Sequence, residues 1–274
     1  MGRRAYFVAV LALVALLNVG LEAQPSARPQ LALLGGFDLE EVVRHAKALT
    51  SFGSRFTGYP GYYEAVKYVN STLRDLGLEA EVHRFPVAVP YDLGAAIFVG
   101  NERVRAHHLY PNLVALGSAG VVEGELAYVG RGTEELSRVD LSGRIAVLEF
   151  ESGGRWVEAL AGGAKALVFL GPARDRMEAL AKISTAPLDV PRVYVEGEGA
   201  ALLREAARKG LKARIEGAYE WRRVEAYNVV ARIPGSSEPE KVVVLAAHLD
   251  SGSIVPALSP GAEEAVNVGL LLHL

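Results

Sequence analysis

The sequence predicts an α/β fold, and three observations support this prediction. Two helix-period segments near the N-terminus are followed by short β-rich segments that alternate with helices through the middle of the chain. Such alternation is typical of a compact α/β unit. Half of the 274 residues are hydrophobic and 22% are charged, which indicates a large buried core and excludes a disordered or fibrous protein.

Composition also limits the partners and the chemistry. The formal net charge of −3 argues against a nucleic-acid-binding surface, which would need a basic stripe. The chain has no cysteine, so disulfides, thiolate metal ligands and cysteine nucleophiles are excluded. Arginine outnumbers lysine, and cysteine and methionine are scarce, which is compatible with a heat-adapted protein.

The N-terminus has the pattern of an export signal or a membrane anchor. Arg3 and Arg4 precede a hydrophobic stretch over residues 5–21, whose uninterrupted apolar part is shorter than the ~20 residues of a bilayer span. Cleavage after Ala23 would remove residues 1–23, and without cleavage the stretch would anchor the protein. We therefore expect a secreted or extracytoplasmic protein, in contact with a membrane only through this segment.

Two helices are predicted next. Asp38 is the expected N-cap of the first, with Glu41 three residues later, and the turn-rich loop Phe52–Gly61 follows it. The second helix ends at Gly77. Apolar residues recur at spacings of three and four in both helices: Leu39, Val42, Val43, Ala46 and Leu49 in the first, and Tyr63, Val66, Tyr68, Val69, Leu73 and Leu76 in the second.

The rest of the chain is predicted as strands with short helices between them. The half-buried or short strands are Leu78–Val89, Val122–Val129, Arg144–Phe150, Ala164–Leu170, Pro191–Val195, Leu211–Ile215 and Ala226–Ile233. The helices are Trp156–Leu160 and Ala200–Arg208. The segment Val242–Ala247 is fully apolar and is predicted as a buried central strand, and Ala265–Leu274 as the opening of a helix.

Candidate chemistry lies at the end of that apolar strand. His248 and Asp250 would lie at its carboxyl end, where ligands and metals gather in open α/β sheets. Glu263 and Glu264 follow a Gly- and Pro-rich loop, so a carboxylate could return beside the histidine, as a hydrolytic zinc site requires. The alternative is structural: a capped turn at the strand end, and a pair of acids that complement the helix dipole.

Other candidates point to structural roles. His107 and His108 are adjacent on a strand, so their side chains would face opposite sides, and we expect a solvated surface there instead of a metal pair. Trp156 and Trp221 are expected in the core or at a seam between domains.

Several segments, in this order, resemble the exported zinc aminopeptidases that carry a protease-associated (PA) insert, such as aminopeptidase Y and glutamate carboxypeptidase. Gly53–Gly61 resembles the loop before the family's first long helix. Three segments resemble consecutive PA segments: Val121–Gly132, Asp140–Glu149 and Glu158–Phe169. Tyr227–Gly235 leads into the His-x-Asp strand, as it does in the family.

The resemblance implies an α/β architecture in which an incomplete zinc-exopeptidase (phosphorylase/hydrolase-like) domain is interrupted by a PA α/β insert. Residues 31–90 would form the first part of the peptidase-like domain, residues 91–218 the insert, and residues 219–274 the start of the peptidase-like sheet.

The resemblance also implies a site with two zinc ions that share a bridging carboxylate. His248 matches a zinc ligand, Asp250 the acid that orients the site, and Glu264 the bridging position, where the family has Asp. Ala265 replaces the asparagine that follows it. The family's general-base Glu, two further acidic or Glu ligands and last His match positions beyond Leu274, so we expect a C-terminally truncated chain with a degenerate metal motif.

The implied function is zinc-dependent hydrolysis of N-terminal residues from peptides, and we expect this chain alone to be inactive. One alternative is a non-catalytic PA-type module on a peptidase remnant, which would bind peptides or proteins. Another is one half of a split peptidase, whose site a downstream polypeptide would complete.

Overall fold

The computed structural model describes residues 36–238 and 240–274. The predicted signal peptide or anchor, residues 1–23, lies outside the described residues. Helices and strands both build the fold, so the predicted α/β class is confirmed. None of the helices in the described ranges is long and apolar enough to cross a bilayer.

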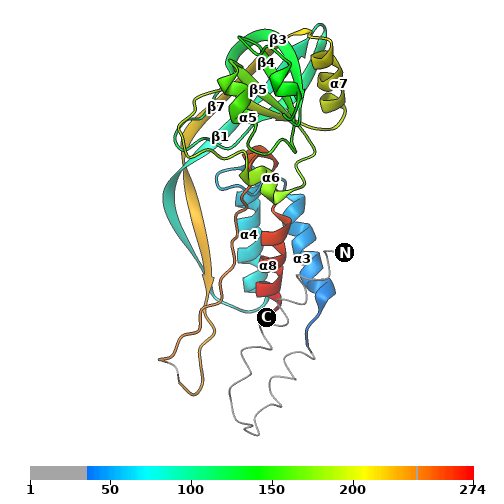
Figure 1. The fold of residues 1–274 in the computed structure, drawn as a ribbon. Helices are drawn as coiled ribbons and strands as arrows, with labels where there is room; N and C mark the ends of the chain where they lie inside the picture. The colour runs from blue at the N-terminus through cyan, green and yellow to red at the C-terminus, as the bar shows by residue number, and fades with distance from the viewer. Residues whose placement is uncertain (1–35, 239) are drawn as a thin grey trace, which may run out of the picture.

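Figure 1 shows a barrel at one end of the molecule, three helices at the other, and a long two-stranded ribbon that extends from the barrel and runs beside the helices. The strands are β1 (Ala80–Val99), β2 (Glu102–His108), β3 (Gly120–Gly130), β4 (Ile145–Glu149), β5 (Ala166–Leu170), β6 (Arg192–Val195) and β7 (Lys212–Ala231). The α-helices are α3 (Leu39–Ser51), α4 (Pro60–Asp75), α5 (Trp156–Ala161), α6 (Arg176–Leu180), α7 (Gly197–Arg208) and α8 (Ala262–His273), with 3-10 turns η1 (Glu135–Ser137) and η2 (Pro256–Leu258).

Helices α3, α4 and α8 pack together around an apolar core. Asp38 caps α3 as predicted, because its carboxylate accepts hydrogen bonds from the N–H groups of Glu40 and Glu41. The close contact of α8 with α3 requires Gly269, since a Cβ there would lie 2.7 Å from the carbonyl oxygen of Val42. The buried residues of this core are Ala46, Leu49, Ala65, Val69, Ala265, Val268 and Leu272.

His273 fastens the end of α8 to the start of α3. Its Nε2 accepts a 2.9 Å hydrogen bond from the backbone N–H of Asp38, and its Nδ1 lies 3.1 Å from Oε2 of Glu41. The acceptor role of Nε2 places the proton of the neutral ring on Nδ1. His273 therefore has a structural role in the helical part of the molecule.

The barrel closes in the order β1-β2-β6-β5-β4-β3-β7. The neighbours β3–β4, β4–β5 and β5–β6 are parallel, and β5 is buried along its whole length. A strand with both faces covered must be continuously apolar, which explains why β4 and β5 could be recognised from their sequences. Apart from alanines, the fully buried aliphatic residues of this core are Ile97, Leu126, Ile145, Val147, Val168, Leu170, Val193, Leu203 and Ile215.

The ribbon formed by β1 and β7 is longer than predicted. Each strand has 20 residues, and they pair antiparallel with a bulge between Asp92 and Ala95. Prediction ended the first strand at Val89, because Pro90 interrupts the pattern, and divided the second into Leu211–Ile215 and Ala226–Ile233. Both interpretations were wrong because β1 pairs with β7 alone before Ala95, so its other edge is open and tolerates proline, and many charged side chains of the ribbon are exposed.

The predicted buried strand Val242–Ala247 was also wrong. The segment has no regular secondary structure, and Val243 is 87% exposed. Apolar, β-branched composition favours a strand only when neighbouring strands supply hydrogen-bond partners. No strand in the described ranges pairs with this segment, so the side chains of residues 242–245 face solvent, while Ala247 packs against the helical core.

Candidate functional site at the start of helix α8

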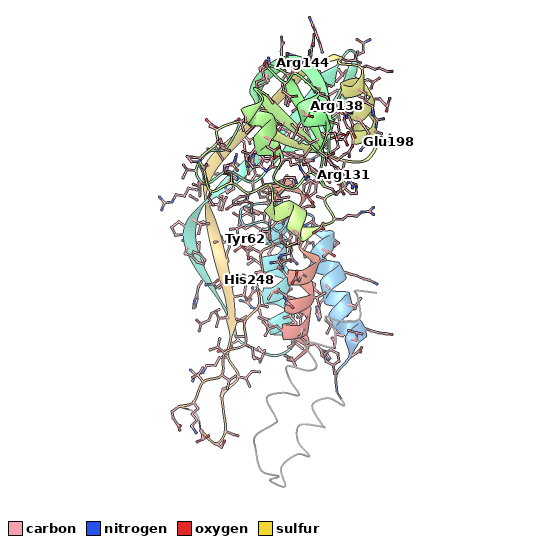
Figure 2. All side chains as sticks on the ribbon, in the orientation of Figure 1. Tyr62, Arg131, Arg138, Arg144, Glu198 and His248 are labelled. Carbon is pink, nitrogen blue, oxygen red and sulfur yellow. The ribbon has the colours of Figure 1, made fainter. Side chains whose placement is uncertain are left out.

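His248 and Asp250 lie in the segment that leads from the ribbon to α8. The imidazole of His248 is exposed over 89% of its surface, and its Nδ1 is 3.7 Å from Oδ1 of Asp250. Figure 2 shows His248 at the level of the helices, in the same part of the molecule as Tyr62 and far from the labelled arginines of the barrel. The predicted His–Asp pair is therefore close in space, with an accessible histidine.

The carboxylate of Asp250 is held by the loop before α4. Oγ1 of Thr57 donates a 2.9 Å hydrogen bond to Oδ2 of Asp250. Tyr62, on the first turn of α4, is buried and exchanges hydrogen bonds with the backbone of Tyr227 on β7. Burial raises the pKa of Tyr62, and the negative charge of Asp250 contributes in the same direction.

Backbone hydrogen bonds join the same loop to the segment before α8. The N–H of Arg55 donates to the carbonyl of Ser259 at 2.8 Å, and the N–H of Ser251 donates to the carbonyl of Arg55 at 3.1 Å. Oγ of Ser54 donates to the carbonyl of Pro256 at 2.6 Å. Two loops that are about two hundred residues apart in sequence therefore form one unit at the start of α8.

Arg55 is the residue of this site that the sequence did not identify. Its side chain is fully buried, and Nη2 donates a 2.9 Å hydrogen bond to the carbonyl of Gly261. Burial lowers the pKa of its guanidinium, whereas the carboxylates of Glu264 and Asp250 act in the opposite direction. The only signal in the sequence was a lone arginine between small and aromatic residues in a turn-rich loop.

Glu264 lies in the first turn of α8, whose N-cap is Gly261 in a left-handed conformation. No side chain caps this terminus, so the two acids of the first turn complement the helix dipole. Oε2 of Glu264 is 2.8 Å from the position that a Cβ on Gly261 would take, and Nη2 of Arg55 is 2.9 Å from that same point. Glu263 instead faces outward, 3.9 Å from Arg176.

The arrangement does not form a complete zinc site. Structural and catalytic zinc sites use three or four protein ligands in a tetrahedral arrangement. Within the described ranges, no group of three or more His, Cys, Asp or Glu side chains is placed so that it could hold a metal ion, and no ion pair joins His248 to Glu264. Asp250 and Glu264 both lie near Arg55, whereas His248 points into solvent.

The expectation for His107 and His108 was wrong, because both are buried. Nδ1 of His108 is 2.7 Å from Oδ1 of Asp92, and Nδ1 of His107 is 3.7 Å from Oδ2. The N–H of Ala119 donates to Nε2 of His108, so the proton of the neutral ring lies on Nδ1 and points at the carboxylate. His108 shares the inward face of β2 with the buried Val104 and Ala106. His107 lies on the other face, where Arg105 is exposed, but the segment around Ile254 covers this end of the strand.

Asp92 lies at the bulge of β1 and joins β1 to β2. Burial alone would raise its pKa, but the interactions with His107 and His108 outweigh burial, and the net pKa lies well below the ordinary value. The backbone N–H of Asp92 donates to the hydroxyl of Tyr59, next to α4. The cluster therefore fastens the barrel to the helical part of the molecule.

The two tryptophans differ. Trp156 is buried in the second core cluster of the barrel, as expected. Trp221, on the ribbon, is 42% exposed and donates from Nε1 to the carbonyl of Val114.

Comparisons with known proteins find similar sequences and folds among peptidases. No family model matches the chain. Carboxypeptidase Q of Xenopus laevis is 27% identical over 253 residues, which are 82% of this chain and 52% of the relative. The chain therefore spans about half the length of the curated relative that it matches.

Solved structures of similar fold include a zinc aminopeptidase from Bacillus subtilis. The TM-score is 0.54 at 17% identity, and the match covers 84% of this chain and 56% of that chain. A peptidase M28 precursor from Shewanella amazonensis has a TM-score of 0.50 at 20% identity, with 81% and 57% covered. Over the part that it covers, the chain shares the fold of these two proteins.

Proposed function

We propose that this chain is part of a zinc-dependent peptidase of the aminopeptidase type. His248, Asp250 and Glu264 would be its contribution to the site, and ligands outside the described residues would complete it. The observation that carries the proposal is the junction at the start of α8, where two distant loops bring Asp250 and Glu264 to one corner beside the His248 segment. The shared fold and the 27% identical relative support it.

The substrate class in this proposal is the N-terminal end of peptides. The barrel, within residues 91–218, would be a PA-type insert beside the site, and the protein would act outside the cytoplasm. Because the described residues do not form a complete zinc site, we derive no hydrolytic step from this chain. Asp250 is held by Thr57 close to His248, and this arrangement suits an acid that orients an imidazole.

The exposed segment Val242–Leu245 favours the split arrangement as a second candidate. Its apolar side chains are more than half exposed, and strands from another polypeptide would cover them and supply the remaining ligands. A non-catalytic module that binds peptides is the remaining alternative.

One set of measurements on the purified chain separates these functions. Bound zinc is quantified by plasma mass spectrometry, and hydrolysis of leucine p-nitroanilide is followed with and without chelator. The test variant is H248A, and the matched control is H83A, which removes an exposed histidine from the ribbon. Zinc that is lost in H248A and retained in H83A supports the peptidase-type site.

The hydrolysis result then decides between the enzymatic forms. Chelator-sensitive turnover by the isolated chain indicates a working peptidase. Zinc bound through His248 without turnover favours the split arrangement. Zinc binding that is unaffected by H248A contradicts the proposal and leaves the binding module. No binding by the isolated chain excludes a self-sufficient site and leaves the split arrangement, in which another polypeptide supplies the remaining ligands.

A further inference from the structure

We propose that Arg55 is a positioning residue: a buried internal cation that holds Glu264, Asp250 and the start of α8 in place without any metal ion. The inference concerns the apo fold and is independent of the function proposed above. It would mean that the negative charges of Asp250 and Glu264 are balanced by a residue of the same chain.

The first support is the burial of an incompletely paired charge. The guanidinium of Arg55 is fully buried, and its Nε and Nη1 have no hydrogen-bond partner within the described ranges. An uncompensated buried charge is strongly unfavourable, so the fold must supply opposite charge nearby. The carboxylates of Glu264 and Asp250 are the acidic groups that act on it.

The second support is the geometry around Gly261. Nη2 of Arg55 and Oε2 of Glu264 each lie less than 3 Å from the same point, the position of a Cβ on Gly261, at 2.9 and 2.8 Å. They do not form a direct ion pair within the described ranges, but a small adjustment of either long side chain would bring them into contact. The lack of a side chain at Gly261 keeps the space between them open.

The third support is that Arg55 contacts the loop before α8 at three points. Its N–H bonds to Ser259, its carbonyl accepts from Ser251, and its side chain bonds to the carbonyl of Gly261. These contacts fix both ends of the loop Ser251–Gly261. Glu264 is one turn further along, so the contacts of Arg55 with Gly261 and its neighbours fix where the first turn of α8, and with it Glu264, begins.

Arg55 also determines whether the start of α8 would need a metal ion beside Asp250 and Glu264. Glu264 already has a cationic neighbour in the chain, so its position does not depend on a bound ion. The start of α8 is then ordered in the metal-free protein, and chelator will not loosen it.

A double-mutant cycle between Arg55 and Glu264 tests the inference. The variants are R55M, E264Q and R55M/E264Q, with E263Q as the matched control because Glu263 is the exposed neighbour. Thermal unfolding is measured with chelator present throughout. We expect R55M to lower the melting temperature by on the order of 10 °C and E264Q by roughly half as much, because each leaves a charge without its partner.

The double variant is the decisive sample. Coupling predicts that R55M/E264Q loses clearly less than the two single losses combined, while E263Q stays within about 1 °C of wild type. R55K, which keeps the charge but not the planar donor group, should recover part of the loss. Additive single losses, or no effect of E264Q, would overturn the proposal.

Hydrogen exchange provides a second readout if R55M does not fold. In folded E264Q, peptides covering residues 251–264 should exchange at least tenfold faster than in wild type, whereas peptides of β4 and β5 should not change. If chelator alone accelerates exchange of residues 251–264 in the wild type, a metal and not Arg55 holds the corner, and the inference is wrong.

Discussion

The hydroxyl of Thr57 donates a 2.9 Å hydrogen bond to Oδ2 of Asp250, and thereby joins positions that are 193 residues apart in the sequence. With the bonds of Ser54 and Arg55 to the segment before α8, it shows that the turn-rich loop before α4 is the base on which the candidate site is built. Residues that carry no obvious chemistry thus determine where the acids lie.

Removal of the Thr57 hydroxyl should loosen Asp250. We expect T57A to lower the free energy of unfolding by about 1 kcal/mol, because one hydrogen bond to a charged acceptor is lost. T57S keeps the hydroxyl and is the control. Urea denaturation of both variants checks the prediction, and equal midpoints for T57A and T57S would contradict it.

A side chain at Gly261 should not be tolerated. Its φ of 62° is left-handed, and a Cβ would lie 2.3 Å from Cβ of Ser251. Gly77 has a similar φ of 79° with nothing within 4 Å of its Cβ position, so G77A isolates the backbone strain.

We expect G77A to cost about 1 kcal/mol and G261A at least about 2 kcal/mol more, since the clash with Ser251 adds to the strain. Denaturant midpoints measure the difference. A G261A protein that is as stable as G77A would show that the loops are not as tightly joined as described.

Stability should fall in acid partly through Asp92. Its pKa is held below the ordinary value near 4 in the folded state, so its contribution is complete above about pH 5 and is lost as the pH falls towards the folded-state value. Between pH 7 and pH 3 the wild type should lose about 1 kcal/mol more than D92N.

At pH 7, D92N should already be about 2–4 kcal/mol less stable, because His108 loses its charged acceptor. D75N, at the exposed end of α4, is the control and should follow the wild type. Denaturation curves at pH 7, 5 and 3 give these differences, and parallel pH dependence of D92N and wild type would argue against the role of Asp92.

The exposure of Val242–Leu245 can be tested by comparing the same substitution, valine to threonine, in this segment and in a buried strand. V243T should alter the unfolding free energy by less than about 0.5 kcal/mol, because Val243 faces solvent. V168T places a hydroxyl in the fully buried β5 and should cost about 1–3 kcal/mol. If V243T is as costly as V168T, the segment is buried after all.

Most of the fold could be predicted from local or continuous patterns in the sequence. The N-cap at Asp38, the apolar runs of β4 and β5 and the helix α8 could be predicted because each depends on its own residues or on complete burial. The full length of the ribbon could not, because its prolines and its exposed charged residues interrupt the pattern, although parts such as Val89, Tyr219 and Ala226 are buried. The segment Val242–Ala247 was misjudged for the opposite reason: its pattern describes a strand, but a strand also needs partners.

The sequence suggested residues for the candidate site but not the contacts that hold them. His248, Asp250 and Glu264 were identified from the motif, whereas the contacts of Arg55 and Thr57 with them depend on loops that meet only in the folded chain. The burial of His107 and His108 was missed because a distant loop covers the end of β2, whereas Arg103 and Arg105 earlier on the strand are exposed. These errors all concern what surrounds a residue in the folded chain, and local sequence does not determine this.

Anomalous diffraction at the zinc edge from zinc-soaked crystals of the full chain tests the central claim most directly. The account predicts a peak beside the imidazole of His248, on the side of Asp250. A peak found only at other histidine–carboxylate pairs, such as His83 with Glu81 or His273 with Glu41, would contradict a peptidase-type site at the start of α8.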